Sequence, residues 1–179
     1  INMNPVVRIV DDDDDYRSSQ TFFLQMCGWE VREYDSAAEF LAEDDSSRPG
    51  CLILDIRMPE MNGLELQQAL VEKGAQLPII FLTGHGDVST AVHAMKYGAC
   101  DFIEKRDDPM VLKCAVEKAV AASLKTAKQV QSDAKRLAAF DELTPREKDV
   151  VLAAALGASN KDIAERFGIG LATVKMHRG

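Results

Sequence analysis

Short apolar segments alternate with segments of helical periodicity over residues 6–105. Cys51–Leu54 and Pro78–Leu82 are apolar at almost every position, which is typical of strands covered by helices on both faces. The segments between the strands carry apolar residues every three or four positions and end at turn-forming glycines. Strands are expected at residues 6–10, 30–34, 51–54, 78–82 and 101–105, and helices at 16–26, from the Ser36–Glu39 capping box, at 63–73 and at 87–97.

This order of elements predicts an α/β fold with a doubly wound, five-stranded parallel sheet of the flavodoxin-like type. Right-handed crossovers place helices on both faces of such a sheet. Ligand sites in these folds lie at the carboxyl ends of the strands, near the point where the strand order reverses. Polar residues that follow the strands are therefore the first candidates for chemistry.

A long helix follows the predicted sheet. Pro109 suits the first turn of a helix, and residues 110–140 contain no Gly or Pro while apolar residues recur every three or four positions. Thirty helical residues would reach about 45 Å, which is too long to cap one small sheet. We interpret the second half as a helical linker whose apolar stripe also suits pairing with another chain. The alternative is a helix broken near Ser123 or Ser132.

The end of the chain has the pattern of a small all-α helix-turn-helix domain. Thr144–Glu147 is a capping box with a proline at the first helical position, and this helix should run to Leu156. Two further short helices, from Ser159 and from Leu171, are separated by a glycine-containing turn. The predicted domains are residues 1–122, a helical linker at 123–140, and residues 141–179.

Charge is distributed unevenly along the chain. The net charge is −8, of which residues 1–141 carry −9 and residues 142–179 carry +1, so the two parts have different surfaces. No apolar run approaches the ~20 residues that span a bilayer, and no export signal is recognisable. The four cysteines are scattered, as in a protein of a reducing compartment. We expect a cytoplasmic protein with no membrane partner.

Polar side chains follow four of the predicted strands. Asp11 and Asp12 follow the first strand, Asp55 the third and Thr83 the fourth, while Lys105 ends the fifth. In a parallel sheet these residues meet at one edge. Crowded carboxylates raise each other's pKa, and Mg²⁺, which prefers oxygen ligands, would relieve the repulsion. Asp55 could then act as a nucleophile toward phosphorus, with Lys105 neutralising the transferred group.

Each of these residues alone has a simpler interpretation. The run Asp11–Asp15 could be a solvated acidic loop, Asp55 could initiate a turn before Met58-Pro59, and Lys105 could be a surface lysine. Their occurrence at the ends of successive strands favours the functional interpretation.

The first part of the sequence resembles the receiver domain of two-component response regulators over residues 5–122. The motifs are Val10–Asp12, Leu54–Gly63, Leu82–Asp87 and Ala99–Lys105, and the Thr-Gly-His-Gly-Asp run is similar to the FixJ branch, including its regulators of aromatic catabolism. The resemblance implies that Asp55 is the phosphoacceptor and that Thr83 and Phe102 form a switch pair. It implies Mg²⁺ ligands as well: Asp12, Asp55 and the Arg57 backbone carbonyl, with Asp11 close by.

The residue after Lys105 departs from the receiver pattern. The family usually has proline there, often after a cis peptide bond, whereas this chain has Arg106-Asp107-Asp108. A cis bond before a residue other than proline costs roughly 3 kcal/mol. We therefore predict a trans bond and an altered loop, which affects the face that such domains use to dimerise.

Residues 141–179 resemble the LuxR/NarL-type output domain. The resemblance implies base contacts from Lys175 and Met176 in the major groove. The residues placed for phosphate and backbone contacts are Lys161, Thr173, His177 and Arg178. Gly170 stands where a Ser or Thr cap is usual, and the sequence stops at Gly179, inside the expected recognition helix. We expect DNA binding by this chain to be poor. A small helical interaction module is the alternative.

Together the two resemblances imply a transcription regulator and not an enzyme. A sensor histidine kinase would phosphorylate Asp55, and the output domain would dimerise on promoter DNA. One alternative is an aspartyl-phosphate hydrolase, but that motif needs a second Asp two residues after the nucleophile, where this chain has Arg57. The other is a receiver-like domain controlled by a ligand or protein contacts without phosphate.

Overall fold

The computed structural model describes residues 3–156, and their contacts divide the chain into two compact units, Ile1–Gln129 and Val130–Gly179. The first unit contains a five-stranded parallel sheet in the order β2-β1-β3-β4-β5. Its strands are β1 (Val6–Val10), β2 (Val31–Tyr34), β3 (Gly50–Leu54), β4 (Ile79–Thr83) and β5 (Asp101–Glu104). The predicted doubly wound α/β fold is therefore confirmed.

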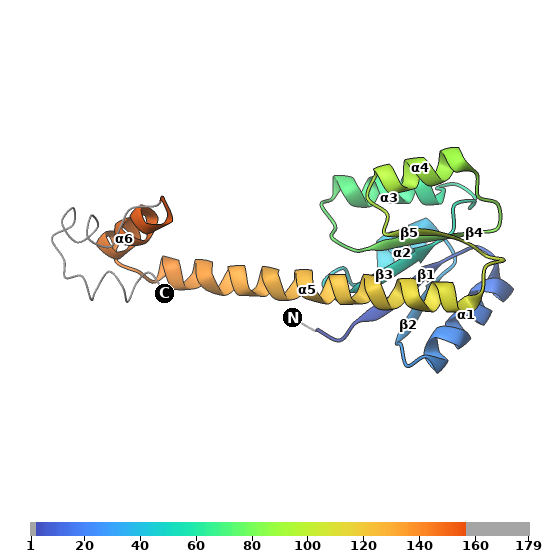
Figure 1. Ribbon diagram of the computed structural model, residues 1–179, viewed down its shortest axis with the longest axis horizontal. Helices are drawn as coiled ribbons and strands as arrows, with labels where there is room; N and C mark the ends of the chain where they lie inside the picture. Colours follow the sequence, from blue (N-terminus) through green and yellow to red (C-terminus); the bar gives the residue numbers. More distant parts are fainter. Residues whose placement is uncertain (1–2, 157–179) are drawn as a thin grey trace. The chain divides into compact units, whose positions relative to one another are not determined.

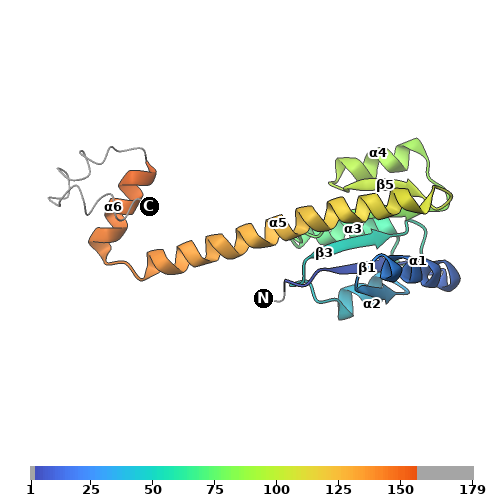
Figure 2. The same cartoon turned by 60° about the horizontal axis from the view of Figure 1, so that its bottom comes forward.

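Helices cover both faces of this sheet (Figures 1 and 2). The helices of the first unit are α1 (Asp14–Met26), α2 (Ala37–Glu43), α3 (Gly63–Glu72), α4 (Val88–Lys96) and the first part of α5 (Pro109–Asp141). One apolar core joins the sheet to α2, α3 and α4, and the other joins it to α1 and α5. Alternate residues of β1 and β3 enter the two cores, because successive side chains of a strand point to opposite faces.

Two local predictions at helix starts need correction. Helix α1 begins at Asp14, two residues before the predicted start, because Asp13 accepts a hydrogen bond from the Tyr16 amide and acts as the N-cap. Asp14 and Asp15 then occupy the first turn, where the helix dipole favours negative charge. At α2, Ser36 caps Glu39 as predicted, but the Glu39 carboxylate accepts from the Asp35 amide, one residue earlier than a capping box requires.

Helix α5 is continuous from Pro109 to Asp141, so the alternative of a break near Ser123 or Ser132 is wrong. Its first half packs on the sheet, with Leu112, Val116 and Val120 buried. The buried Ser123 hydroxyl accepts a hydrogen bond of 3.0 Å from the Gly50 amide at the start of β3. A small polar residue in the helix thus satisfies a buried backbone donor of the sheet instead of ending the helix.

The described part of the second unit includes helix α6 (Pro145–Ala155). Its predicted capping box is confirmed, since Thr144 accepts from the Glu147 amide and Glu147 accepts from the Thr144 amide. The helix buries Val150 and Ala153. Among residues 3–156, no helix is both long and apolar enough to cross a membrane.

Candidate functional site

Three aspartates gather at the carboxyl edge of the sheet. Asp11 and Asp12 follow β1, and Asp55 follows β3, the strand that pairs with β1 through Val10 and Leu54. One carboxylate oxygen from each aspartate lies within 4.8 Å of the others. Asp11 and Asp55 are buried while Asp12 is exposed. The predicted gathering of these carboxylates at one edge is therefore confirmed.

The Lys105 side chain completes this cluster from β5. Its ammonium nitrogen lies 2.7 Å from Asp11 Oδ2 and 3.5 Å from Asp55 Oδ2. The Lys105 amide donates to the Thr83 carbonyl at 2.8 Å, which fixes the start of the side chain beside β4. Burial opposes the charge of Lys105, but the hydrogen bond to Asp11 and the charges of Asp55 and Asp11 together raise its pKa.

Burial first, and then the neighbouring charge of Asp11, raise the pKa of Asp55, which lies at about 6. Lys105 and the Ile56 amide, which donates to Asp55 Oδ1 at 2.8 Å, work against this rise. The ionised carboxylate is therefore held where its charge is only partly compensated. A set of carboxylate oxygens with an unbalanced negative charge fits a hard divalent cation such as Mg²⁺.

Thr83, the last residue of β4, and Phe102, within β5, both lie near Gly86. Thr83 is buried, and its hydroxyl accepts from the His85 amide at 3.3 Å. The Phe102 ring is half-buried, with its centroid 6.2 Å from that of Phe81. A Cβ on Gly86 would lie 2.7 Å from Phe102 Cε1 and 3.3 Å from Thr83 Cγ2. Glycine at position 86 therefore makes room for the packing of both residues.

Sequence reasoning missed two residues of helix α1 that support the site. The Arg17 guanidinium donates to the Asp11 carbonyl at 2.6 Å and so holds the loop between β1 and α1. The Tyr16 ring lies against Lys105, whose ammonium is 4.3 Å from the ring centroid. Tyr16 is the first residue of the helix predicted at 16–26, but no sequence signal pairs it with a residue 89 positions later.

The loop after β5 begins with the predicted trans peptide bond. The Lys105–Arg106 peptide bond is trans, like every other peptide bond of residues 3–156. The loop closes as a turn in which the Asp107 amide donates to the Glu104 carbonyl and the Asp107 side chain accepts from the Glu104 amide. Asp108 then accepts from the Met110 amide at the start of α5. Acidic side chains thus replace the conformational restriction that a proline would give.

The remaining predicted residues fall into two groups. Arg57, whose backbone carbonyl is a predicted Mg²⁺ ligand, lies two residues after Asp55, and its side chain is exposed. The predicted DNA contacts lie outside the described residues; they are Lys161, Thr173, Lys175, Met176, His177 and Arg178.

Comparison with known families identifies both parts of the chain. Residues 7–117 match the response regulator receiver domain, and residues 141–179 match the LuxR family of bacterial regulatory proteins. The chain belongs to the response regulators. The predicted resemblance to receivers with a LuxR-type output domain is therefore confirmed.

Named relatives share this combination of domains over almost the whole chain. The transcriptional regulatory protein TdiR of Thauera aromatica is 40% identical over 173 residues, covering 97% of this chain and 76% of TdiR. The transcriptional regulatory protein FixJ of Rhizobium meliloti is 42% identical over 173 residues, covering 96% and 84%. The solved structure of the response regulator StyR is 37% identical with a TM-score of 0.81, covering 98% and 88%.

Proposed function

We propose that this response regulator receives a phosphoryl group on Asp55 from a sensor histidine kinase and thereby controls transcription through its C-terminal domain. One observation carries this proposal: a buried aspartate with a raised pKa lies beside a second carboxylate at the carboxyl edge of a receiver sheet, and one lysine ammonium reaches both carboxylates. In the reaction a carboxylate oxygen of Asp55 bonds to phosphorus while the bond from phosphorus to the donor's imidazole nitrogen breaks.

The neighbouring residues have separate parts in this proposal. Lys105, already 3.5 Å from Asp55, would move from its pair with Asp11 toward the arriving phosphoryl oxygens and offset their charge. The Thr83 hydroxyl would turn to donate to a phosphoryl oxygen, and the Phe102 ring, which already lies beside Gly86, would shift with it. Their positions in the present structure support this coupling, because both side chains line the space where a Cβ on Gly86 would lie.

Mg²⁺ is the proposed cofactor. Asp11, Asp12, Asp55 and the backbone carbonyl of Arg57 would hold it, and the carboxylate spacing supports this choice. When bound, the cation supplies positive charge that favours the approach of an anionic phosphoryl donor to an anionic nucleophile.

The proposed output is promoter DNA binding by the domain at residues 141–179, with residues 123–140 as linker and residues 1–122 as receiver. The match of residues 141–179 to the LuxR family supports this assignment. Lys175 and Met176 would read base edges, while contacts to phosphate and backbone would come from Lys161, Thr173, His177 and Arg178. Because the proposed role is to bind promoter DNA, we propose that the protein is cytoplasmic. We also propose that it is not an enzyme acting on an external substrate.

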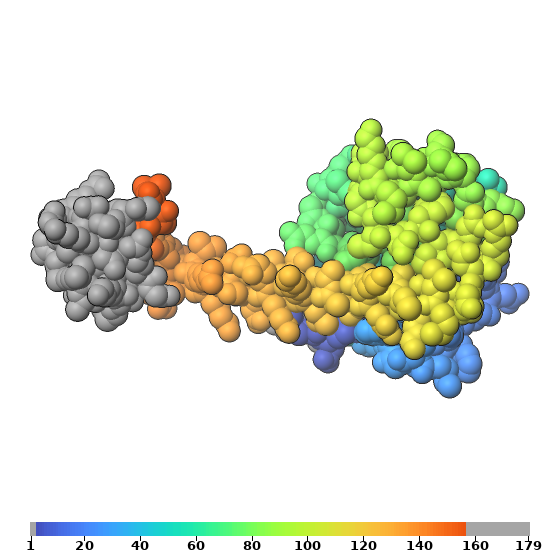
Figure 3. Space-filling model, viewed as in Figure 1, coloured from blue at the N-terminus to red at the C-terminus, as the bar shows by residue number. Residues whose placement is uncertain are grey.

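A homodimer is the proposed active state. Helix α4 and the start of α5, which flank the β5 edge of the sheet and are visible in the space-filling view (Figure 3), carry exposed apolar side chains. These are Val88, Val92, Met95, Met110 and Val111. Burial of such a patch between two copies would remove apolar surface from water, and a shift of Phe102 at the neighbouring strand β5 would change that patch.

Transfer from acetyl phosphate in the presence of Mg²⁺ tests the phosphoacceptor. Intact mass should show one added phosphoryl group on the wild-type protein and none on Asp55→Asn, because the amide is not a nucleophile. Asp15→Asn is a matched control, since it removes an exposed carboxylate of the same acidic run and should leave labelling unchanged. Equal labelling of wild type and Asp55→Asn would refute the assignment.

A further inference from the structure

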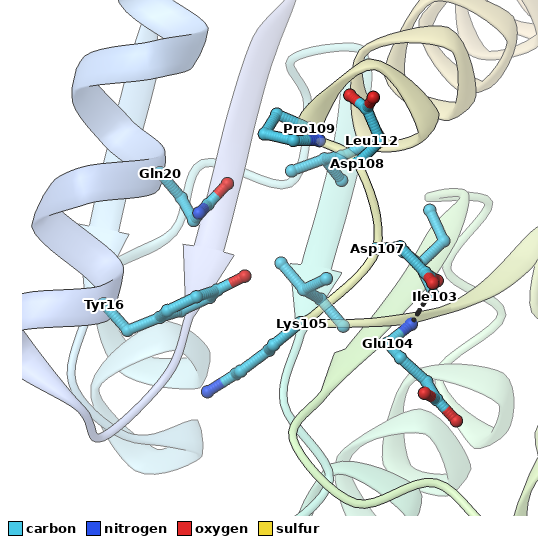
Figure 4. A pocket seen from close by; sticks show the side chains of 10 residues that line it. Tyr16, Gln20, Ile103, Glu104, Lys105, Asp107, Asp108, Pro109 and Leu112 are labelled. Atoms are coloured by element: carbon cyan, nitrogen blue, oxygen red, sulfur yellow. Dashed lines mark hydrogen bonds between the residues drawn. The ribbon is translucent and has the colours of Figure 1, made fainter.

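Lys105 is held at its ammonium end by two different kinds of group. On one side are the carboxylates of Asp11 and Asp55, at 2.7 and 3.5 Å. On the other side is the ring of Tyr16, whose centroid lies 4.3 Å from the same nitrogen. Figure 4 shows the Lys105 side chain running from the end of β5 to the Tyr16 ring, which extends from helix α1. Three elements thus converge on one ammonium group.

The lysine side chain needs such support. It is a flexible four-carbon stem with a compact charge, and holding it in one position costs rotamer entropy. The next two residues along the chain, Arg106 and Asp107, make contacts with Glu104. These contacts do not involve the Lys105 ammonium. If Asp11 and Asp55 bind another partner in place of Lys105, the Tyr16 ring still contacts the ammonium. Because the ring is neutral, it does not compete with an incoming anion for the positive charge of Lys105.

We propose that Tyr16 is a positioning residue for phosphoryl transfer, whose ring face holds the Lys105 ammonium at the edge of the Asp55 carboxylate. This inference rests on the proposed function of Asp55. Tyr16 and Lys105 are both half-buried, and the Lys105 side chain is only 17% exposed. A cation–π interaction becomes stronger when water is excluded. The contact between Lys105 and Tyr16 should therefore be stronger than the same contact at an exposed surface.

The state of the Tyr16 hydroxyl agrees with this assignment. Burial, followed by the charges of Asp11 and Asp55, raises the pKa of Tyr16 to about 12. The hydroxyl therefore stays protonated and the ring neutral at physiological pH. Lys105 then meets the electron-rich face of a neutral ring instead of a phenolate, and phenylalanine should serve as well as tyrosine.

A simpler interpretation is that Tyr16 only fills space. Its ring also packs against the core cluster that includes Leu24, Leu82 and Ile103. Packing alone predicts that any side chain of similar volume suffices and that substitutions act on stability. Positioning predicts a requirement for an aromatic face and an effect that depends on Lys105.

The test compares Tyr16→Phe with Tyr16→Leu and Tyr16→Met in the full chain, using the initial rate of labelling by acetyl phosphate with Mg²⁺. Tyr16→Phe should remain within about twofold of wild type, whereas Leu and Met should slow labelling about threefold to tenfold, the range that a cation–π contact of this kind supports. Leu and Met differ in shape, so a packing defect caused by one of them should not appear in the other. Thermal unfolding of each variant identifies such a defect.

A second readout reports the contact itself. In NMR spectra, the ε-methylene protons of Lys105 should show an upfield ring-current shift in wild type and Tyr16→Phe that is lost in Tyr16→Leu and Tyr16→Met. In a Lys105→Met background, Tyr16→Leu should cause no further loss of labelling rate, because the group that it positions is gone.

The outcomes separate this inference from the proposed function. If Asp55→Asn abolishes labelling but Tyr16→Leu and Tyr16→Met react at the wild-type rate, or Tyr16→Phe is slowed as much as they are, the role of Tyr16 is refuted. The same follows if Tyr16→Leu slows labelling equally with and without Lys105. If Asp55→Asn is still labelled, the proposed function itself fails, whatever the Tyr16 variants do.

Discussion

At the scale of single residues, burial of Asp55 has a consequence for stability. Its pKa is raised from 3.8 to about 6, so between these values the folded state binds more protons than the unfolded state. The free energy of unfolding therefore falls as pH rises from about 4 to about 6 and stays lower above that range. The cost of ionising the buried carboxyl disappears fully only below the unfolded pKa.

Asp55→Asn should remove this dependence. We expect the variant to match wild type near pH 4 and to be more stable by about 1 to 3 kcal/mol above pH 7, measured by urea denaturation without divalent cations. Added Mg²⁺ should stabilise wild type more than the variant, since a cation favours the ionised carboxylate. A stability difference that does not change with pH would contradict the assigned cause.

The residues that carry the proposed chemistry were largely predictable, whereas those that support them were not. Asp55, Lys105 and Thr83 follow from strand endings, because a parallel sheet brings all its carboxyl ends to one edge. Arg8 was predicted only as part of a strand, yet it is fully buried and pairs with Asp44 at 3.0 Å. That partner lies 36 residues away, at the end of α2, and no local pattern indicates the contact.

At the scale of elements, the lack of a side chain at Gly86 lets the loop after β4 pack closely against Phe102 of β5. Its backbone is not in the left-handed region, so its lack of a side chain matters only for contacts. Gly86→Ala should push the Phe102 ring or the Thr83 methyl aside and destabilise the protein by about 1 to 3 kcal/mol. Thermal and chemical denaturation measure this effect.

Gly84→Ala is the matched control, because its new Cβ would meet only Lys105 Cδ at 3.9 Å, an ordinary contact. In combination, Phe102→Leu should recover most of the loss caused by Gly86→Ala, since the shorter side chain vacates the space. Equal destabilisation by the two alanine variants, or no recovery with Phe102→Leu, would argue against steric coupling between Gly86 and Phe102.

Helix boundaries show what limits prediction at this scale. The end of α1 was predicted correctly because Gly28 adopts a positive φ of 95° after it, which is a strong local signal. Its start was misplaced because five consecutive aspartates offer several possible caps, and only the packed loop selects Asp13. For α5 the sequence allowed either a continuous helix or one broken near Ser123 or Ser132. The helix is continuous, with Ser123 buried against the sheet.

At the scale of the whole molecule, the receiver unit contains its own core. Every buried residue of the two clusters that sandwich the sheet lies before residue 121, and the contacts divide the chain after Gln129. A fragment of residues 1–129 should therefore unfold cooperatively and accept one phosphoryl group from acetyl phosphate as the full chain does.

The matched control is a fragment of residues 1–118, which lacks Ala119, Val120 and Ser123 and leaves the Gly50 amide without its partner. It should be markedly less stable, because it exposes apolar core and orphans a buried donor. If residues 1–129 fail to fold while the full chain is stable, the receiver depends on the rest of the chain.

The sequence by itself determined the α/β class, the parallel sheet, the acidic edge around Asp55 and the two families, since each depends on periodicity or on short local motifs. Only the tertiary structure decided that Tyr16 lies over Lys105, that Arg17 holds the Asp11 loop and that Phe102 fills the space beside Gly86. These contacts join side chains from different elements. Their formation depends on helix placement and rotamer choice in a packed core, which the spacing of residues along the chain does not specify.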